Sequence, residues 1–134
     1  MPTFRYAKLV RDNIPEWHRA NGHTVKGRQL TGDELRNALC WKLHEEADEV
    51  SGALSREELI EEIGDVQQIL DDLCLAEGIT KEALRGVIAE KAARKGGFLA
   101  GEYIDTVTIP DETDKWAQYC RQSPDKYPEV EETT

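Results

Sequence analysis

Four carboxylates occur in the chain as two pairs with the same spacing. Glu46 is followed three residues later by Glu49, and Glu62 is followed three residues later by Asp65. On a helix, residues three apart lie on the same face about one turn apart, so each pair presents two carboxylates side by side. Carboxylate oxygens are the ligands that Mg²⁺ and Mn²⁺ prefer. The two pairs therefore predict a divalent metal site, provided that two helices bring them together.

The position of these acids relative to the apolar residues favours a metal site over plain surface charge. At ~100° per residue, one apolar stripe follows the first predicted helix and a second follows the next, and each stripe has an acid at its edge. Burying unpaired carboxylates costs several kcal/mol, and a bound cation would offset that cost. The two stripes are Leu35, Leu39, Leu43, Ala47 and Val50, then Leu59, Ile63, Val66, Ile69, Leu70 and Leu73. The alternative, a solvated acidic face, better suits the remaining acids of the stretch: Asp48, Glu57, Glu58 and Glu61.

Capping signals predict that the two acid pairs lie on an antiparallel helix hairpin. Thr31 with Glu34, and Ser55 with Glu58, match the capping box that opens a helix. We expect helices over about residues 31–50 and 55–76, the second ending before Gly78. A short link makes consecutive helices antiparallel, which would place the acid pairs opposite each other.

Further segments belong to an expected all-α antiparallel helical bundle, which we expect oligomerisation to complete. A short helix is predicted from Asn13 to about Ala20, and a third long helix over about residues 81–95 after Thr80. Residues 102–109 alternate and are rich in β-branched side chains, which predicts a short strand after the last long helix. We expect residues 1–105 to form the main domain and residues 106–134 to be a polar, acidic and partly disordered extension.

Charge is unevenly distributed along the 134 residues, whose net charge is −10. Residues 31–80 carry three Lys or Arg against fourteen Asp or Glu, whereas residues 1–30 carry six against two and residues 81–101 carry five against two. An acidic chain is a poor generic nucleic-acid binder, but basic segments that flank an acidic centre suit a small anion that arrives with a metal. Lys91 and Arg94, three apart at the end of the third long helix, are candidates for a phosphate clamp. The alternative is that they only complement the helix C-terminus.

Other features favour a cytoplasmic protein. No apolar run approaches the ~18 residues of a membrane span, and no leader segment is apparent. Cys40, Cys74 and Cys120 are far apart and lack metal-binding spacings, which is typical of reduced thiols.

The motifs together resemble the all-α nucleoside triphosphate pyrophosphohydrolases. That superfamily includes MazG, the dimeric dUTPases, the dCTP pyrophosphatases and phosphoribosyl-ATP pyrophosphohydrolase, and its signature is ExxE, a spacer and ExxD on antiparallel helices. The flanks are most similar to the MazG-like house-cleaning branch: KLVRDNIPE at 8–16, KLHEEADE at 42–49, EEIGD at 61–65 and EKAARKGGF at 90–98. The spacer, residues 50–61, is short for the superfamily, and residues 106–134 match no part of it.

The resemblance implies Mg²⁺-dependent hydrolysis of a nucleoside triphosphate to the monophosphate and pyrophosphate, and it leaves open whether the substrate is a canonical, a non-canonical or a deoxy nucleotide. Mn²⁺ would be an alternative metal. It implies that the metal ligands are Glu46, Glu49, Glu62 and Asp65, with Glu45 orienting or deprotonating a water. It implies phosphate binding by Lys91, Arg94, Lys42, Lys8 and Arg11. It also implies a homodimer or homotetramer with sites near the subunit interface.

Three alternatives stay open at this point. One is the phosphoribosyl-ATP substrate of the same superfamily. A second is a carboxylate-bridged di-iron or di-manganese protein, but His18, His23 and His44 supply no Glu-x-x-His motif, which that class usually needs. The third is a non-catalytic helical module that binds metal or a partner. No residue pattern indicates which base is preferred.

Overall fold

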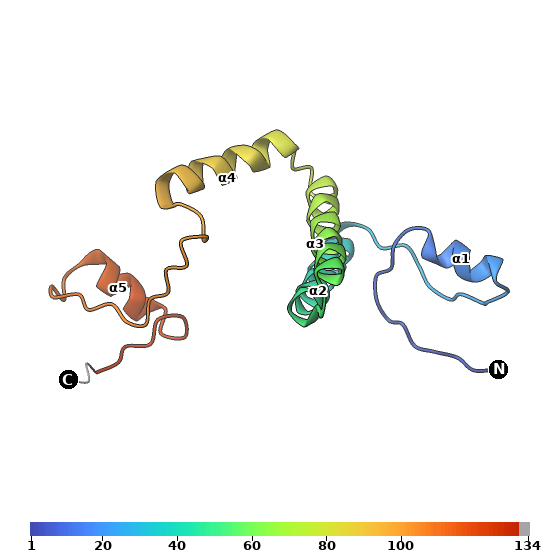
Figure 1. Cartoon of the computed structure of the whole chain (residues 1–134), viewed down its shortest axis with the longest axis horizontal. Helices are drawn as coiled ribbons and strands as arrows, with labels where there is room; N and C mark the ends of the chain where they lie inside the picture. Colours follow the sequence, from blue (N-terminus) through green and yellow to red (C-terminus); the bar gives the residue numbers. More distant parts are fainter. Residues whose placement is uncertain (132–134) are drawn as a thin grey trace. The chain divides into compact units, whose positions relative to one another are not determined.

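A computed structural model describes residues 1–131, which contain five α-helices and no strand (Figure 1). The helices are α1 (Ile14–Ala20), α2 (Gly32–Gly52), α3 (Arg56–Ala76), α4 (Lys81–Lys95) and α5 (Lys115–Gln122). The predicted all-α class is therefore confirmed for this part of the chain. Disorder predicted for the last residues, 132–134, falls outside the described residues. The chain divides into two compact units, residues 1–95 and the residues from Gly96 onward, which are described separately below.

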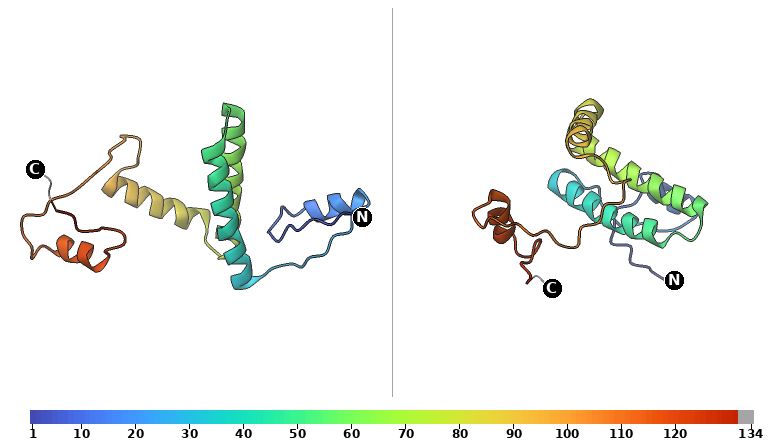
Figure 2. Two further views of the ribbon diagram at one scale, coloured as in Figure 1. Left: turned by 90° about the horizontal axis from the view of Figure 1, so that it is seen from below. Right: turned by 60° about the vertical axis from the view of Figure 1, so that its left-hand side comes forward.

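Helices α2 and α3 form the hairpin that the sequence predicts. They pack side by side along their length, as Figure 2 shows from two directions, and residues 53–55 link them. Leu39 on α2 and Ile69 on α3 are the buried centre of the contact. The predicted stripes are only partly covered, because a single partner helix shields one side of each. Ile63 and Leu70, predicted to be buried, are 51% and 37% exposed, and Ala47 is also exposed.

The start of α3 agrees with its predicted cap, whereas the start of α2 does not. Ser55 Oγ accepts a hydrogen bond from the Glu58 N–H at 3.1 Å, and the Glu58 carboxylate accepts one from the Leu54 N–H at 2.9 Å. Thr31 precedes α2 but makes no side-chain capping bond, so the predicted capping box is wrong there. Its partner Glu34 instead accepts a 2.8 Å bond from Arg28. A charged donor binds a carboxylate more strongly than a backbone N–H does, which accounts for the change.

Helices α1 and α4 begin and end where the sequence predicts. Thr80 Oγ1 accepts a bond from the Ala83 N–H at 3.1 Å in the first turn of α4, and Gly96 follows this helix with φ +80°. Glycine adopts this left-handed conformation without a steric penalty, which is why it commonly terminates helices. After α1, Gly22 has φ +77° and the His23 N–H donates to the His18 carbonyl at 3.0 Å.

The second unit contains a helix that the sequence analysis missed. Asp114 caps α5 by accepting a 2.7 Å bond from the Trp116 N–H, and the Trp116 and Tyr119 rings stack with centroids 4.8 Å apart. Tyr127 packs edge-on against Trp116, and Arg121 donates two hydrogen bonds to Glu129. The Asp114 cap was the available signal. The extension beyond residue 105 thus holds a local fold, and the unit boundary at residues 95/96 lies before the predicted domain boundary at 105/106.

The strand predicted over residues 102–109 is wrong. That segment is irregular, and no strand lies within residues 96–131 to pair with it. An alternating sequence forms a strand only when another strand satisfies its backbone groups.

None of the described helices is long and apolar enough to cross a membrane.

Candidate metal centre

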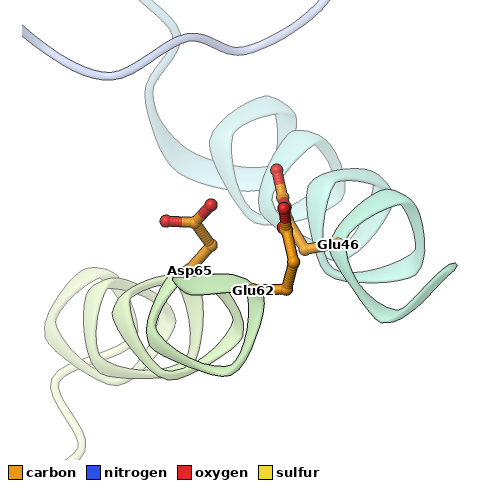
Figure 3. A group of neighbouring side chains, drawn as sticks. All are labelled: Glu46, Glu62 and Asp65. Atoms are coloured by element: carbon orange, nitrogen blue, oxygen red, sulfur yellow. The ribbon is translucent and has the colours of Figure 1, made fainter. Parts of the chain in front are cut away.

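Three of the four predicted metal ligands converge between α2 and α3. One carboxylate oxygen from each of Glu46, Glu62 and Asp65 lies within 4.8 Å of the other two, and Figure 3 shows the three side chains reaching toward one another from the two helices. We call these three residues the acid cluster. The Glu46 side chain is only 12% exposed, whereas that of Asp65 is 38% exposed. The hairpin accounts for the arrangement, because its short link brings position 46 of α2 opposite position 62 of α3.

Glu49, the fourth predicted ligand, is exposed and does not belong to the acid cluster. Its charge nevertheless acts on the cluster. The pKa of Glu62 is raised by desolvation, by a hydrogen bond with Glu46, and by the charges of Glu46, Asp65 and Glu49. The structure therefore brings three of the four predicted ligands together and leaves Glu49 outside the group, so their role as metal ligands stays a prediction.

Lys42 and Lys8 lie beside the acid cluster and share one carboxylate, that of Glu45. Lys42 Nζ is 3.3 Å from Glu45 Oε1 and 3.5 Å from Glu46 Oε1, and Lys8 Nζ is 3.5 Å from Glu45 Oε1. Partial burial alone would raise the pKa of Glu45. The hydrogen bonds and charges of Lys42 and Lys8 outweigh that effect and lower its pKa. A carboxylate with a lowered pKa is a weaker base, so Glu45 becomes more basic only when the two lysines no longer pair with it.

Arg11 reaches the acid cluster from the N-terminal segment. Its guanidinium donates a hydrogen bond to Asp65 Oδ1 and forms an ion pair with it. We call residues 4–12 the N-terminal strap; this segment contains Lys8 and Arg11, and it turns at Ala7, whose φ is +47°. The family resemblance implies that both cations bind phosphate. No pattern in the sequence indicates that each pairs with a particular carboxylate. Pairing over 54 positions depends on tertiary structure rather than on spacing.

Lys91 and Arg94 are not joined to the acid cluster by any ion pair or hydrogen bond within residues 1–131. Arg94 pairs with Glu90 one turn earlier on α4, with Nε and Oε1 3.0 Å apart. Both side chains are exposed, and α2 with α3 is the only pair of described helices that packs extensively. Their proposed contact with phosphate thus stays a prediction.

The donor set of the acid cluster fits a small divalent cation. All three groups offer carboxylate oxygens, which suit Mg²⁺ and Mn²⁺ and do not suit metals that prefer sulfur or imidazole. Desolvation and the neighbouring carboxylates raise the pKa of Glu62, and a divalent cation between the carboxylates would remove their mutual repulsion.

No protein-family model matches the chain. No solved structure matches it significantly. A curated protein of Mycolicibacterium smegmatis (strain ATCC 700084 / mc(2)155), described as uncharacterized, is 47% identical over 55 residues. That match spans 41% of this chain and 56% of the length of the relative. The comparison therefore shows a related sequence without assigning an activity.

Proposed function

We propose that the chain is a Mg²⁺-dependent nucleoside triphosphate pyrophosphohydrolase of the MazG-like type. The observation that carries this proposal is the convergence of Glu46, Glu62 and Asp65 from two antiparallel helices to within 4.8 Å. The resemblance of the flanking motifs to that family supports it independently, because those motifs include the N-terminal strap and the end of α4 as well as the acids. The reaction would split the bond between the α and β phosphates, giving a nucleoside monophosphate and pyrophosphate.

In this proposal the carboxylates of the acid cluster hold Mg²⁺, and Glu49 completes or supports the set from its exposed position one turn away. Bound Mg²⁺ supplies charge neutralisation at the phosphate oxygens and acidifies water. The cations of Lys8, Arg11 and Lys42 offset the negative charge of the triphosphate, which four neighbouring acids would otherwise repel. Lys91 and Arg94 would add donors for the outer phosphates.

Glu45 is the candidate that orients or deprotonates the attacking water. Its two lysine partners, Lys8 and Lys42, hold its pKa down. When phosphate oxygens draw these lysines away, Glu45 loses the charges that lower its pKa and becomes a better proton acceptor. Binding of substrate would in this way prepare the base.

Steady-state assays on a panel of nucleoside triphosphates, each with Mg²⁺, with Mn²⁺ and with chelator, test this function. We expect pyrophosphate release that requires a divalent cation and is lost in Glu46→Gln. Phosphoribosyl-ATP belongs in the same panel, because the acid cluster does not discriminate between bases. If no member of the panel is hydrolysed while Mg²⁺ binds at Glu46, the non-catalytic helical module replaces the enzyme as the account of this site.

A further inference from the structure

The acid cluster is contacted by a cation of the chain itself. Asp65, one of its three carboxylates, accepts a hydrogen bond from the Arg11 guanidinium. The two residues lie 54 positions apart, on the N-terminal strap and on α3. The nearby Lys42–Glu46 pair is a local contact within one helix, because both residues lie on α2 one turn apart. The Arg11 pair is therefore the contact that joins the strap to the cluster.

A divalent cation at the acid cluster would compete with Arg11 for Asp65. Both need the same carboxylate oxygens, and a guanidinium within hydrogen-bond distance of a ligand would lie a few ångströms from the metal, where the two positive charges repel. We propose that Arg11 is a displaceable internal counterion of the acid cluster, released from Asp65 when a divalent cation binds and then free to pair with a phosphate group of the incoming substrate. This inference rests on the proposed metal site.

The geometry allows the side chain to leave while the strap stays in place. The Arg11 side chain is 61% exposed, so its guanidinium has open space to move into. The Arg11 carbonyl accepts a 3.1 Å bond from the Ile14 N–H at the start of α1, which fixes the backbone independently of the side chain. Before substrate binds, Lys8 stays paired with Glu45, outside the acid cluster, and Tyr6 Oη lies 3.4 Å from His18 Nε2 on α1. Three contacts thus hold the strap without the Arg11 side chain.

This role differs from that of an ordinary phosphate ligand or a structural ion pair. If Arg11 and the metal compete for Asp65, removal of the Arg11 charge must tighten metal binding in the absence of substrate, because binding at coupled sites is reciprocal. An arginine that only contacts phosphate leaves metal binding unchanged. An arginine that only stabilises the fold leaves it unchanged or weaker. Tighter metal binding after removal of the Arg11 charge therefore distinguishes the counterion from the other two roles.

The test measures Mn²⁺ binding to the full chain by calorimetry, without nucleotide, for the wild type, Arg11→Gln and Arg19→Gln. Arg19 is the matched control, because it is an arginine of the same N-terminal region that pairs with Glu16 and not with the cluster. Since exposed ion pairs are worth up to ~1 kcal/mol, we expect Arg11→Gln to bind Mn²⁺ about 2- to 5-fold more tightly and Arg19→Gln to bind as the wild type does. Unchanged or weaker binding by Arg11→Gln overturns the proposal.

A second readout follows the side chain directly. The Nε–H resonance of Arg11, assigned by its loss in Arg11→Gln, should shift during titration with diamagnetic Mg²⁺ and exchange faster with water, while that of Arg19 stays constant. A resonance that is unaffected at saturating Mg²⁺ contradicts displacement. Glu46→Gln distinguishes the two levels of the argument. If Mn²⁺ binding depends on Glu46 but not on Arg11, the counterion alone is overturned. If the wild type shows no saturable Mn²⁺ binding, the metal site and the counterion are overturned together.

Discussion

At the residue scale, Glu62 shows how the acid cluster affects the ionisation of one of its members. Its pKa is raised by desolvation and by the neighbouring acids, chiefly Glu46. The folded protein therefore holds this proton to a higher pH than the unfolded chain does. It follows that the contribution of Glu62 to stability is favourable at low pH and is lost as pH rises through its folded pKa.

Replacing Glu62 by Gln should remove that pH dependence. In the presence of chelator, Glu62→Gln should melt at a higher temperature than the wild type at neutral pH, and the difference should shrink as pH falls, because protonated Glu62 no longer repels its neighbours. Thermal melts of both proteins between about pH 4 and pH 8 measure this. Asp72→Asn, on the exposed side of α3, is a suitable control. A difference that is constant over this pH range would contradict the raised pKa.

The candidate site was predictable from sequence only as far as local spacing determines it. The three-residue spacing and the short link are enough to bring Glu46, Glu62 and Asp65 together. The exposure of Glu49 depends on how far α2 rotates about its axis when it packs on α3, and spacing does not fix that rotation. The pairing of Arg11 with Asp65 depends on the path of an irregular segment, which has no periodicity from which to infer it.

At the element scale, α2 and α3 offer a comparison between a helix start with a side-chain cap and one without. Ser55 Oγ accepts the Glu58 N–H at the start of α3, whereas Thr31 makes no such bond at the start of α2. Ser55→Ala should lower the free energy of unfolding by about 1 kcal/mol, the usual loss on removing a helix cap. Thr31→Ala should change it by a few tenths at most. Chemical denaturation of both variants measures this, and equal losses would show that the cap of α3 contributes nothing specific.

Lys91 and Arg94 on α4 give a second prediction at this scale. If they bind phosphate, Lys91→Ala and Arg94→Ala should each lower kcat/KM strongly and leave Mn²⁺ binding without nucleotide nearly unchanged. Lys95→Ala is the matched control, because Lys95 lies in the last turn with Arg94 and shares any favourable interaction with the helix dipole. That interaction is worth about 0.3–1 kcal/mol of stability. Normal kinetics together with a lowered melting temperature in all three variants would exclude the phosphate clamp.

The helices were the most predictable elements, and the irregular segments the least. The boundaries of α3 and α4 could be predicted from their capping residues and from the glycines that follow them, because these signals act within a few residues. The strand expected over residues 102–109 failed because strand formation depends on a partner elsewhere in the chain. Helix α5 was missed because residues 106–134 were expected to be a polar, partly disordered extension, although Asp114 stands at the cap position.

At the scale of the whole molecule, the described residues bury few apolar side chains. Leu39 and Ile69 are the only buried hydrophobic residues within 1–131, and several large apolar side chains of α3 and α4 are exposed: Ile60, Ile63, Leu70, Leu75, Leu84, Val87 and Ile88. Exposed apolar side chains in this number are typical of an interaction surface. They support the proposal that the helices are completed by further copies of the chain.

Sedimentation equilibrium should accordingly give a mass that is a multiple of 15.2 kDa. Ile60 and Ile63 lie about one turn apart on α3 and are 58% and 51% exposed. The double variant Ile60→Asp and Ile63→Asp should dissociate the assembly, because burying two new carboxylates in an apolar contact is costly. Val130→Asp, in the second unit, should leave the mass unchanged. A wild type that sediments as a single chain would contradict the oligomer.

The central claim is that the acid cluster serves cleavage between the α and β phosphates. The most direct test is phosphorus NMR of the products formed from a hydrolysed nucleoside triphosphate with Mg²⁺, compared with Glu46→Gln under identical conditions. The account predicts pyrophosphate and a nucleoside monophosphate as the first products of the wild type, and no turnover by the variant. Orthophosphate and a nucleoside diphosphate as first products, or undiminished turnover by Glu46→Gln, would contradict it.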